Sequence, residues 1–313
     1  MSPARRVVGA LLLALLAGEI AVDVVTSPDS AINEFFSTWV HVALVFASGA
    51  VCLVRGATQG RRGRAWVCFG LALTWFGTGE AIASFVYTSS IPLPSPADIF
   101  WILWYPFAIA GLVLLVLDRI PRFELHRWID GLAIVVLVAI PGVSLVLEPA
   151  ARQAVQRGLP QLLNFAYPLA DLLLIGAVVG LLPLTAWRPG RTWILLGLGL
   201  LVTALGDAVY SVQAAARTYT GGKYDFLWSA GAVMIAFAAW QPSERPVELP
   251  PVVGWRAIIL PVAAQIVAIA IQIYAFFHPL PESERLLTAA VLVLAVVQIV
   301  VTRPRPATAP GAG

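Results

Sequence analysis

"RTWILLGLGLLVTALGDAVYSV" (191–212) is an almost unbroken run of apolar residues that carries a single carboxylate, Asp207, near its end. At 1.5 Å per residue, about 20 such residues in a helix cross the roughly 30 Å hydrocarbon layer of a bilayer. A strand of a membrane barrel needs only about half that length and alternates apolar with polar residues. The stretch therefore predicts a transmembrane helix.

Similar runs recur along the whole chain, which has 313 residues, 59% of them hydrophobic and 12% charged. This composition excludes an ordinary soluble domain. We expect an all-α integral membrane protein, a bundle of about ten transmembrane helices forming one polytopic domain over residues 1–302, followed by a disordered, Pro- and Ala-rich cytoplasmic tail over 303–313. The expected spans are 7–25, 35–54, 65–87, 99–117, 128–147, 164–186, 192–215, 226–241, 257–277 and 286–302.

Arginine and lysine lie mainly in alternate connections between these spans, and this bias sets orientation because positively charged loops stay in the cytoplasm. Fifteen of the 20 basic residues fall on one side. We therefore expect a multi-pass protein of the plasma membrane with both termini in the cytoplasm. The first span follows Arg5 and Arg6. It lacks a good small-residue cleavage site, so we expect an uncleaved helix rather than a signal peptide.

The sequence contains no motif for catalysis or for nucleic-acid binding. The net charge is only +3, and the basic loops are already explained by orientation, so nucleic acid is not an expected partner. With three histidines and no phosphate-binding loop, HExxH or CxxC motif, we expect neither enzymatic activity nor a metal or cofactor. Cys52 and Cys68 flank a loop predicted to be cytoplasmic, where thiols stay reduced.

Shifting the chain by 127 positions aligns "RAWVCFGLALTWFGTGEAIAS" (64–84) with "RTWILLGLGLLVTALGDAVYS" (191–211), so that Glu80 meets Asp207. The same shift pairs residues at the start of the next span, Asp98 with Asp225 and Trp101 with Trp228. This pattern predicts a four-helix internal repeat.

The two repeat units would cover about 35–147 and 164–277, with the first and last spans as additions. The copies are an even number of spans apart and share one orientation, so their axis would run along the membrane normal.

Several ionisable side chains fall inside the apolar spans, at a similar depth in the half predicted to face the exterior. A carboxylate near the centre of the hydrocarbon costs a few kcal/mol, so such residues usually face the bundle interior or a wet cavity. We expect an outward-facing acidic cavity that binds a small ligand or cation. The candidate ligand-binding residues are Glu80, Asp171, Asp207, His41, Tyr167 and Tyr210.

An alternative interpretation is that these residues only tie helices together through hydrogen bonds. His41 is either a satisfied buried histidine or a pH-sensing partner of the acids. Two other acids have simpler interpretations as helix starts. "SPAD" (95–98) reads as a capping box with Ser95 as the N-cap, and Asp225 is expected to cap the span that follows it.

Five stretches resemble the N-terminal multispanning region of actinobacterial signalling proteins that carry GGDEF, often followed by EAL, domains for cyclic-di-GMP turnover. They are "PSPADIFWILWYPFAIAGLVLL" (94–115), "RWIDGL" (127–132), "FAYPLADLLLIG" (165–176), "ALGDAVYSV" (204–212) and "FLWSAGAVMIAFAAWQP" (226–242). The resemblance covers roughly residues 1–302 and implies a sensory input region. The GGDEF and EAL signatures are absent from this sequence, so no catalytic residue is carried over.

These observations lead us to expect a noncatalytic, stand-alone sensory module in the lipid bilayer, read by a separate cytoplasmic signalling protein. A proton- or cation-coupled small-molecule transporter is the first alternative, because parallel repeats and intramembrane acids also occur in carriers. A structural or assembly protein of the membrane is the second, and it would tolerate neutral replacements of the acids.

Overall fold

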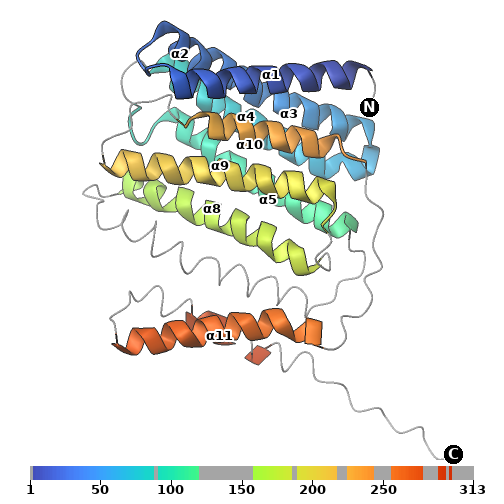
Figure 1. Cartoon of the computed structure of the whole chain (residues 1–313), viewed down its shortest axis with the longest axis vertical. Helices are drawn as coiled ribbons and strands as arrows, with labels where there is room; N and C mark the ends of the chain where they lie inside the picture. The colour runs from blue at the N-terminus through green and yellow to red at the C-terminus, as the bar shows by residue number, and fades with distance from the viewer. Residues whose placement is uncertain are drawn as a thin grey trace, which may run out of the picture.

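The computed structural model describes residues 3–87, 91–119, 158–184, 189–216, 224–242, 255–277, 288–293 and 296–297. Within these ranges the regular structure is helical and contains no strand, so the all-α prediction is confirmed for them (Figure 1). The elements are α1 (Pro3–Val25), α2 (Ala31–Phe35), the π-helical turn η1 (Phe36–Val40), α3 (His41–Thr58), the 3₁₀ turn η2 (Gly60–Gly63), α4 (Arg64–Val86), α5 (Pro96–Arg119), α8 (Leu159–Leu184), α9 (Arg191–Ala216), α10 (Phe226–Ala239) and α11 (Trp255–Phe277).

Five helical segments in the described ranges are long and apolar enough to cross a membrane. They are α1, the run Ala31–Thr58, α4, α5 and most of α9. Eight of the predicted spans coincide with observed helices. The span 128–147 and the tail 303–313 lie outside the described residues, and 286–302 is described only at 288–293 and 296–297. The number ten therefore stays a prediction, as does the internal repeat.

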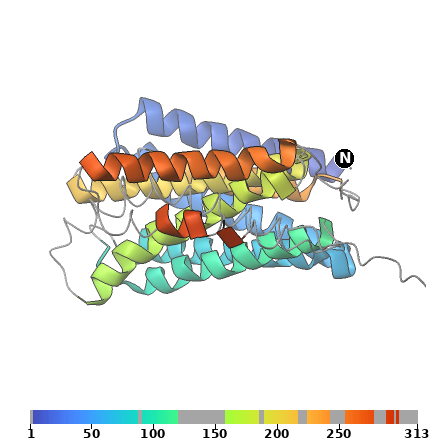
Figure 2. The same ribbon diagram turned by 90° about the horizontal axis from the view of Figure 1, so that it is seen from below.

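The helices lie side by side with nearly parallel axes (Figure 1). The sequential neighbours α3, α4 and α5 pack together, α9 packs on α10, and α10 also contacts α3 and α1. Figure 2 shows α8 running obliquely across the bundle, where it contacts both α5 and α9. Helix α11 contacts the short helical stretch at 288–293, since Gln265 Nε2 donates to the Val291 carbonyl at 3.3 Å.

Small residues allow the central helices to approach closely. A Cβ placed on Gly199 of α9 would lie 2.8 Å from the carbonyl oxygen of Gly231 in α10. A Cβ on Gly70 of α4 would lie 2.6 Å from Leu53 of α3. Close backbone approach at small residues is the usual way in which membrane helices gain packing contacts. It brings the polar side chains on α3, α4, α9 and α10 within reach of one another.

The two predicted helix caps have different outcomes. At the start of α5 the Ser95 backbone N–H donates to Asp98 Oδ2 at 2.6 Å, which is one of the two bonds of a capping box. The Ser95 hydroxyl donates to the same carboxylate oxygen at 3.1 Å. The predicted Asp225 cap is wrong, because its side chain makes no capping bond to α10. Its backbone is already helical (φ −64°, ψ −24°), whereas a capping side chain usually needs an extended N-cap. The Asp23 carboxyl of α1 lies against the Phe226 N–H instead.

Candidate functional site

The ionisable side chains of the described helices gather at two opposite ends of the bundle. Glu80 and Arg64 lie on α4, and Asp207 and Arg191 lie on α9. The rise of a helix separates each acid from its arginine by about 24 Å along the axis. At the end of the bundle that holds these arginines, Arg55 Nη2 at the end of α3 donates to the carbonyl of Gln241, just after α10, at 2.9 Å. We call these the acidic end and the arginine end.

The first polar group, which we call the His41 cluster, joins four helices. His41 Nδ1 lies 3.0 Å from Glu19 Oε1, and the Ser229 hydroxyl lies 2.9 Å from that oxygen and 2.8 Å from Nδ1. On the other edge of the imidazole, His41 Nε2 lies 3.4 Å from Glu80 Oε2. Glu19, His41 and Ser229 are almost completely buried, with exposed fractions of 0%, 2% and 0%.

Hydrogen bonding within the His41 cluster is incomplete. Glu19 Oε2 and His41 Nε2 are buried without a hydrogen-bond partner, although Nε2 remains in ion-pair range of Glu80. One imidazole between two carboxyl groups cannot neutralise both of them when all three are ionised. Because an uncompensated buried charge is costly, the cluster is suited to take up a proton or a cation.

The second group, the Asp171 cluster, brings α5, α8, α9 and α10 together. The Tyr105 hydroxyl donates to Asp171 Oδ1 at 2.9 Å, and Trp228 Nε1–H donates to Asp207 Oδ1 at 3.0 Å. The carboxyl groups of Asp171 and Asp207 lie within hydrogen-bonding reach of each other. Two ionised carboxylates at this separation repel, so a shared proton or a bound cation would stabilise the pair.

A tryptophan from the following helix binds an acid in the same way in two places. Trp101 Nε1–H donates to Glu80 Oε1 at 2.9 Å, as Trp228 does to Asp207. In each place the indole lies against the glycine that precedes the acid. A Cβ would lie 2.6 Å from the Trp101 ring at Gly79 and 2.8 Å from Trp228 Nε1 at the equivalent glycine of α9. The tryptophan, the glycine and the acid thus have the same arrangement at two places that lie 127 residues apart in the sequence.

Tyr167 of α8 extends the polar network to the start of α5. Its hydroxyl donates to Asp98 Oδ1 at 2.6 Å, while Ser95 contacts the other carboxyl oxygen. The Tyr167 ring lies 6.4 Å from the ring of Tyr105, which bonds Asp171. Asp98 therefore serves both its own helix start and a contact between helices.

The structure brings five of the six predicted site residues into these groups. His41 and Glu80 lie in one cluster, Asp171 and Asp207 in the other, and Tyr167 adjoins the second. Each of these five residues makes at least one polar contact with a neighbouring side chain, and none of them lines the pocket described next.

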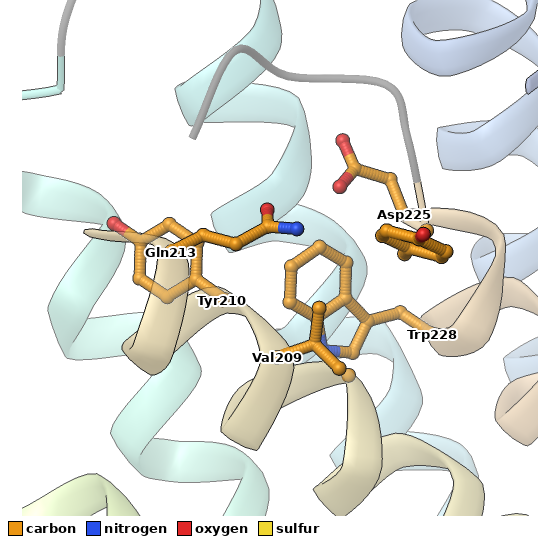
Figure 3. A pocket seen from close by; sticks show the side chains of 7 residues that line it. Val209, Tyr210, Gln213, Asp225 and Trp228 are labelled. Carbon is orange, nitrogen blue, oxygen red and sulfur yellow. The ribbon is translucent and has the colours of Figure 1, made fainter. Parts of the chain in front are cut away.

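Tyr210, the sixth predicted residue, lies with its ring 6.3 Å from that of Trp228 and lines a shallow hollow that has no room for a water-sized molecule (Figure 3). We call this hollow the aromatic pocket. Its lining residues are Gly206, Val209, Tyr210, Gln213, Tyr224, Asp225 and Trp228.

Several members of the network were not among the predicted site residues. Glu19 and Ser229 complete the His41 cluster, and Tyr105 and Trp228 complete the Asp171 cluster. Glu19 carries the signal of any intramembrane acid, but its partner depends on α1 packing beside α3 and α10. Ser229 and Tyr105 carry no such signal, because isolated hydroxyls are common in apolar helices.

Comparison of the chain with protein-family models, curated proteins and solved structures gives no match. In the described part of the chain no group of three or more His, Cys, Asp or Glu side chains has an arrangement that could hold a metal ion. Function therefore has to be inferred from the geometry of the network.

Proposed function

We propose that the protein is a noncatalytic, multi-pass sensor of the plasma membrane. In this proposal a proton or a small ligand arrives at the acidic end, changes the charge of the network, and alters how its helices pack. A separate cytoplasmic protein would read the change at the arginine end. The observation that carries the proposal is the buried network itself, which links α1, α3, α4, α5, α8, α9 and α10 through ionisable groups and their hydrogen-bond partners.

Helix packing would respond to this network because its bonds cross helix boundaries. Glu19 of α1 reaches His41 of α3 and Ser229 of α10, and Asp207 of α9 reaches Trp228 of α10. Adding or removing one charge at these positions changes the stability of several helix contacts together. A ligand that binds two arrangements with different affinity shifts the balance between them.

The distribution of polar groups favours sensing over transport. Between the network and the arginine end, the described helices carry no Asp, Glu, His, Lys or Arg side chain. Thr74 and Thr203, which lie in that interval, bond carbonyl oxygens of their own helices. A proton relay would need further ionisable groups along its path. The network thus has no ionisable continuation toward the arginine end in the described helices.

The test measures proton flux and helix movement on the same protein. Full-length protein with both native cysteines replaced carries nitroxide labels at Val24 of α1 and Val212 of α9, two exposed positions at the acidic end. We expect the label-to-label distance to differ between about pH 5.5 and about pH 8, a range over which a histidine network can change its charge. In liposomes that contain a pH-sensitive dye we expect no flux.

The Glu80→Gln/Asp207→Asn double variant should lose the distance change. Glu34→Gln is the matched control, because Glu34 is an exposed acid of α2 outside the network, and this variant should keep the change. Proton flux that disappears in the double variant would identify a carrier and refute the sensor. If the label-to-label distance does not depend on pH in the labelled protein that keeps Glu80 and Asp207, both the sensor and its mechanism are refuted and only the structural role remains.

A further inference from the structure

The imidazole of His41 has a carboxyl group at each of its two nitrogen atoms. Nδ1 lies 3.0 Å from Glu19 Oε1, and Nε2 lies 3.4 Å from Glu80 Oε2. A neutral imidazole carries a proton on one nitrogen only, and its other nitrogen is an acceptor. If both acids are ionised, one edge of a neutral ring therefore places a lone pair against a carboxylate. Both edges are satisfied only when the three groups together hold one additional proton.

The edge of the imidazole toward Glu19 is the one that keeps its proton. Glu19 is fully buried, its Oε2 has no hydrogen-bond partner, and its Oε1 accepts from the Ser229 hydroxyl at 2.9 Å. Without a proton, Nδ1 would be a second acceptor only 2.8 Å from the same hydroxyl. The buried carboxylate would then lose a donor at a high cost. We therefore place a proton on Nδ1 in every charge state of the cluster.

The additional proton is gained and lost at the edge toward Glu80. This carboxyl group has another donor, because Trp101 Nε1–H donates to its Oε1 at 2.9 Å. Its side chain also keeps 14% of its surface exposed, compared with 0% for Glu19. Glu80 can thus stay ionised when the proton leaves, and it is the carboxyl group through which a proton exchanges with water.

The surroundings of this edge favour protonation. Apart from Glu19 and Glu80, the titratable groups that face His41 or its acids from the packed helices are themselves acids: Asp23 of α1, Asp207 of α9, and Asp225, which precedes α10 and acts on Asp23. Helix α10 adds the uncharged Ser229 hydroxyl and the edge of the Trp228 ring, and η1 adds no titratable group. Among the described residues every arginine lies toward the arginine end. Nearby negative charges favour the protonated form of a site.

We propose that the proton itself is the stimulus of the sensor and that it binds between His41 Nε2 and Glu80 Oε2. A proton needs no cavity, and the described residues provide no arrangement for a metal ion. When the proton passes to water as the pH rises, a lone pair faces the Glu80 carboxylate, and this contact between α3 and α4 weakens. The contact between α1 and α3 through Nδ1 remains. The effect on helix packing rests on the proposed sensory function, whereas the proton site does not depend on it.

The test is solid-state NMR of the full chain in liposomes, with ¹⁵N in the histidine side chains. His126→Gln and His278→Gln leave His41 as the only histidine. We expect both ring nitrogens to be protonated near pH 5.5, and Nε2 but not Nδ1 to lose its proton by about pH 8.

Two nearly isosteric variants should fix opposite tautomers of the neutral ring. In Glu80→Gln the carboxamide can donate to Nε2, so the ring should stay neutral with its proton on Nδ1 over the whole pH range. In Glu19→Gln the carboxylate that holds the Nδ1 proton is absent, so at about pH 8 the proton should lie on Nε2 against Glu80. Glu34→Gln is the matched control, because Glu34 is an exposed acid of α2, and it should leave the titration unchanged.

A ring that keeps one protonation state between pH 5.5 and 8, or that loses the Nδ1 proton first, would overturn the proposal. Replacing Na⁺ with N-methylglucamine at constant pH should leave the spectrum unchanged. A change would identify Na⁺ as the stimulus in place of the proton.

The distance between the labels at Val24 and Val212 separates this proposal from the sensory function. Titration of His41 at a constant distance would refute the sensor and leave the proton site in place. A distance that depends on pH while His41 does not titrate would refute the proton site and leave the sensor, with the Asp171 cluster as the group that responds.

Discussion

Replacing Trp228 with phenylalanine keeps a ring against α9 but removes the N–H that bonds Asp207 at 3.0 Å. Replacing Trp101 removes the corresponding bond to Glu80 at 2.9 Å. Trp75 provides a matched control, because its Nε1 is buried without a hydrogen-bond partner. We expect Trp228→Phe and Trp101→Phe to lower the free energy of unfolding by about 1 kcal/mol more than Trp75→Phe does.

The part of this cost that belongs to the bond itself comes from a double-mutant cycle. Asp207→Leu and Glu80→Met remove the carboxyl groups with little change in shape. Measured hydrogen bonds between membrane helices contribute on average about 0.6 kcal/mol and at most about 1.7 kcal/mol. Each tryptophan and its acid should therefore show a coupling energy in this range, equivalent to about a 3- to 18-fold change in the folding equilibrium.

The assay is reversible unfolding of the purified protein in mixed micelles by titration with sodium dodecyl sulfate, followed by circular dichroism. Trp75→Phe combined with Asp207→Leu should be additive, because the Trp75 ring packs against Phe100 and Phe107 of α5. A coupling energy near zero in both cycles would show that the two indole bonds are not part of the folded protein. Coupling in only one cycle would refute the structural equivalence of the two sites.

Three further predictions concern packing, charge and orientation. Gly206→Ala places a Cβ 2.8 Å from Trp228 Nε1. This overpacking should lower the free energy of unfolding by about 1–3 kcal/mol in the same titration, and no loss would show that the indole can move aside. His41→Ala leaves the fully buried Glu19 without its imidazole partner. It should cost about 3–5 kcal/mol, part of which a second change, Glu19→Leu, should restore. A cysteine at Arg61 should react with a membrane-impermeant maleimide only in permeabilised cells, and labelling of intact cells would contradict the predicted orientation.

Apolar patterning predicts most of the described fold because the bilayer imposes it. A helix must continue while the chain is in hydrocarbon, so the predicted span 99–117 lies inside α5 and 192–215 lies inside α9. Patterning does not predict the π-helical turn Phe36–Val40, which joins α2 to α3 in one continuous run. That turn changes the direction in which side chains point without changing hydropathy.

The depth of the acids could be counted from the sequence, but their partners could not. Glu80 follows Arg64 by the same number of residues as Asp207 follows Arg191, so the sequence places the two acids at the same depth. In the structure the two acids lie equally far along α4 and α9. That Glu19 meets His41 depends on where α1 docks, and no sequence pattern reports this position. The Asp225 cap failed for a related reason, because a carboxyl group from another helix already occupies the start of α10.

The length of α10 has a consequence for the bilayer around the bundle. This helix has 14 residues, whereas its neighbour α9 has 26 residues. The helical rise makes α10 about 21 Å long and α9 about 39 Å long. Because α10 is enclosed by other helices, with nine of its residues buried, its shortness does not force the bilayer to thin.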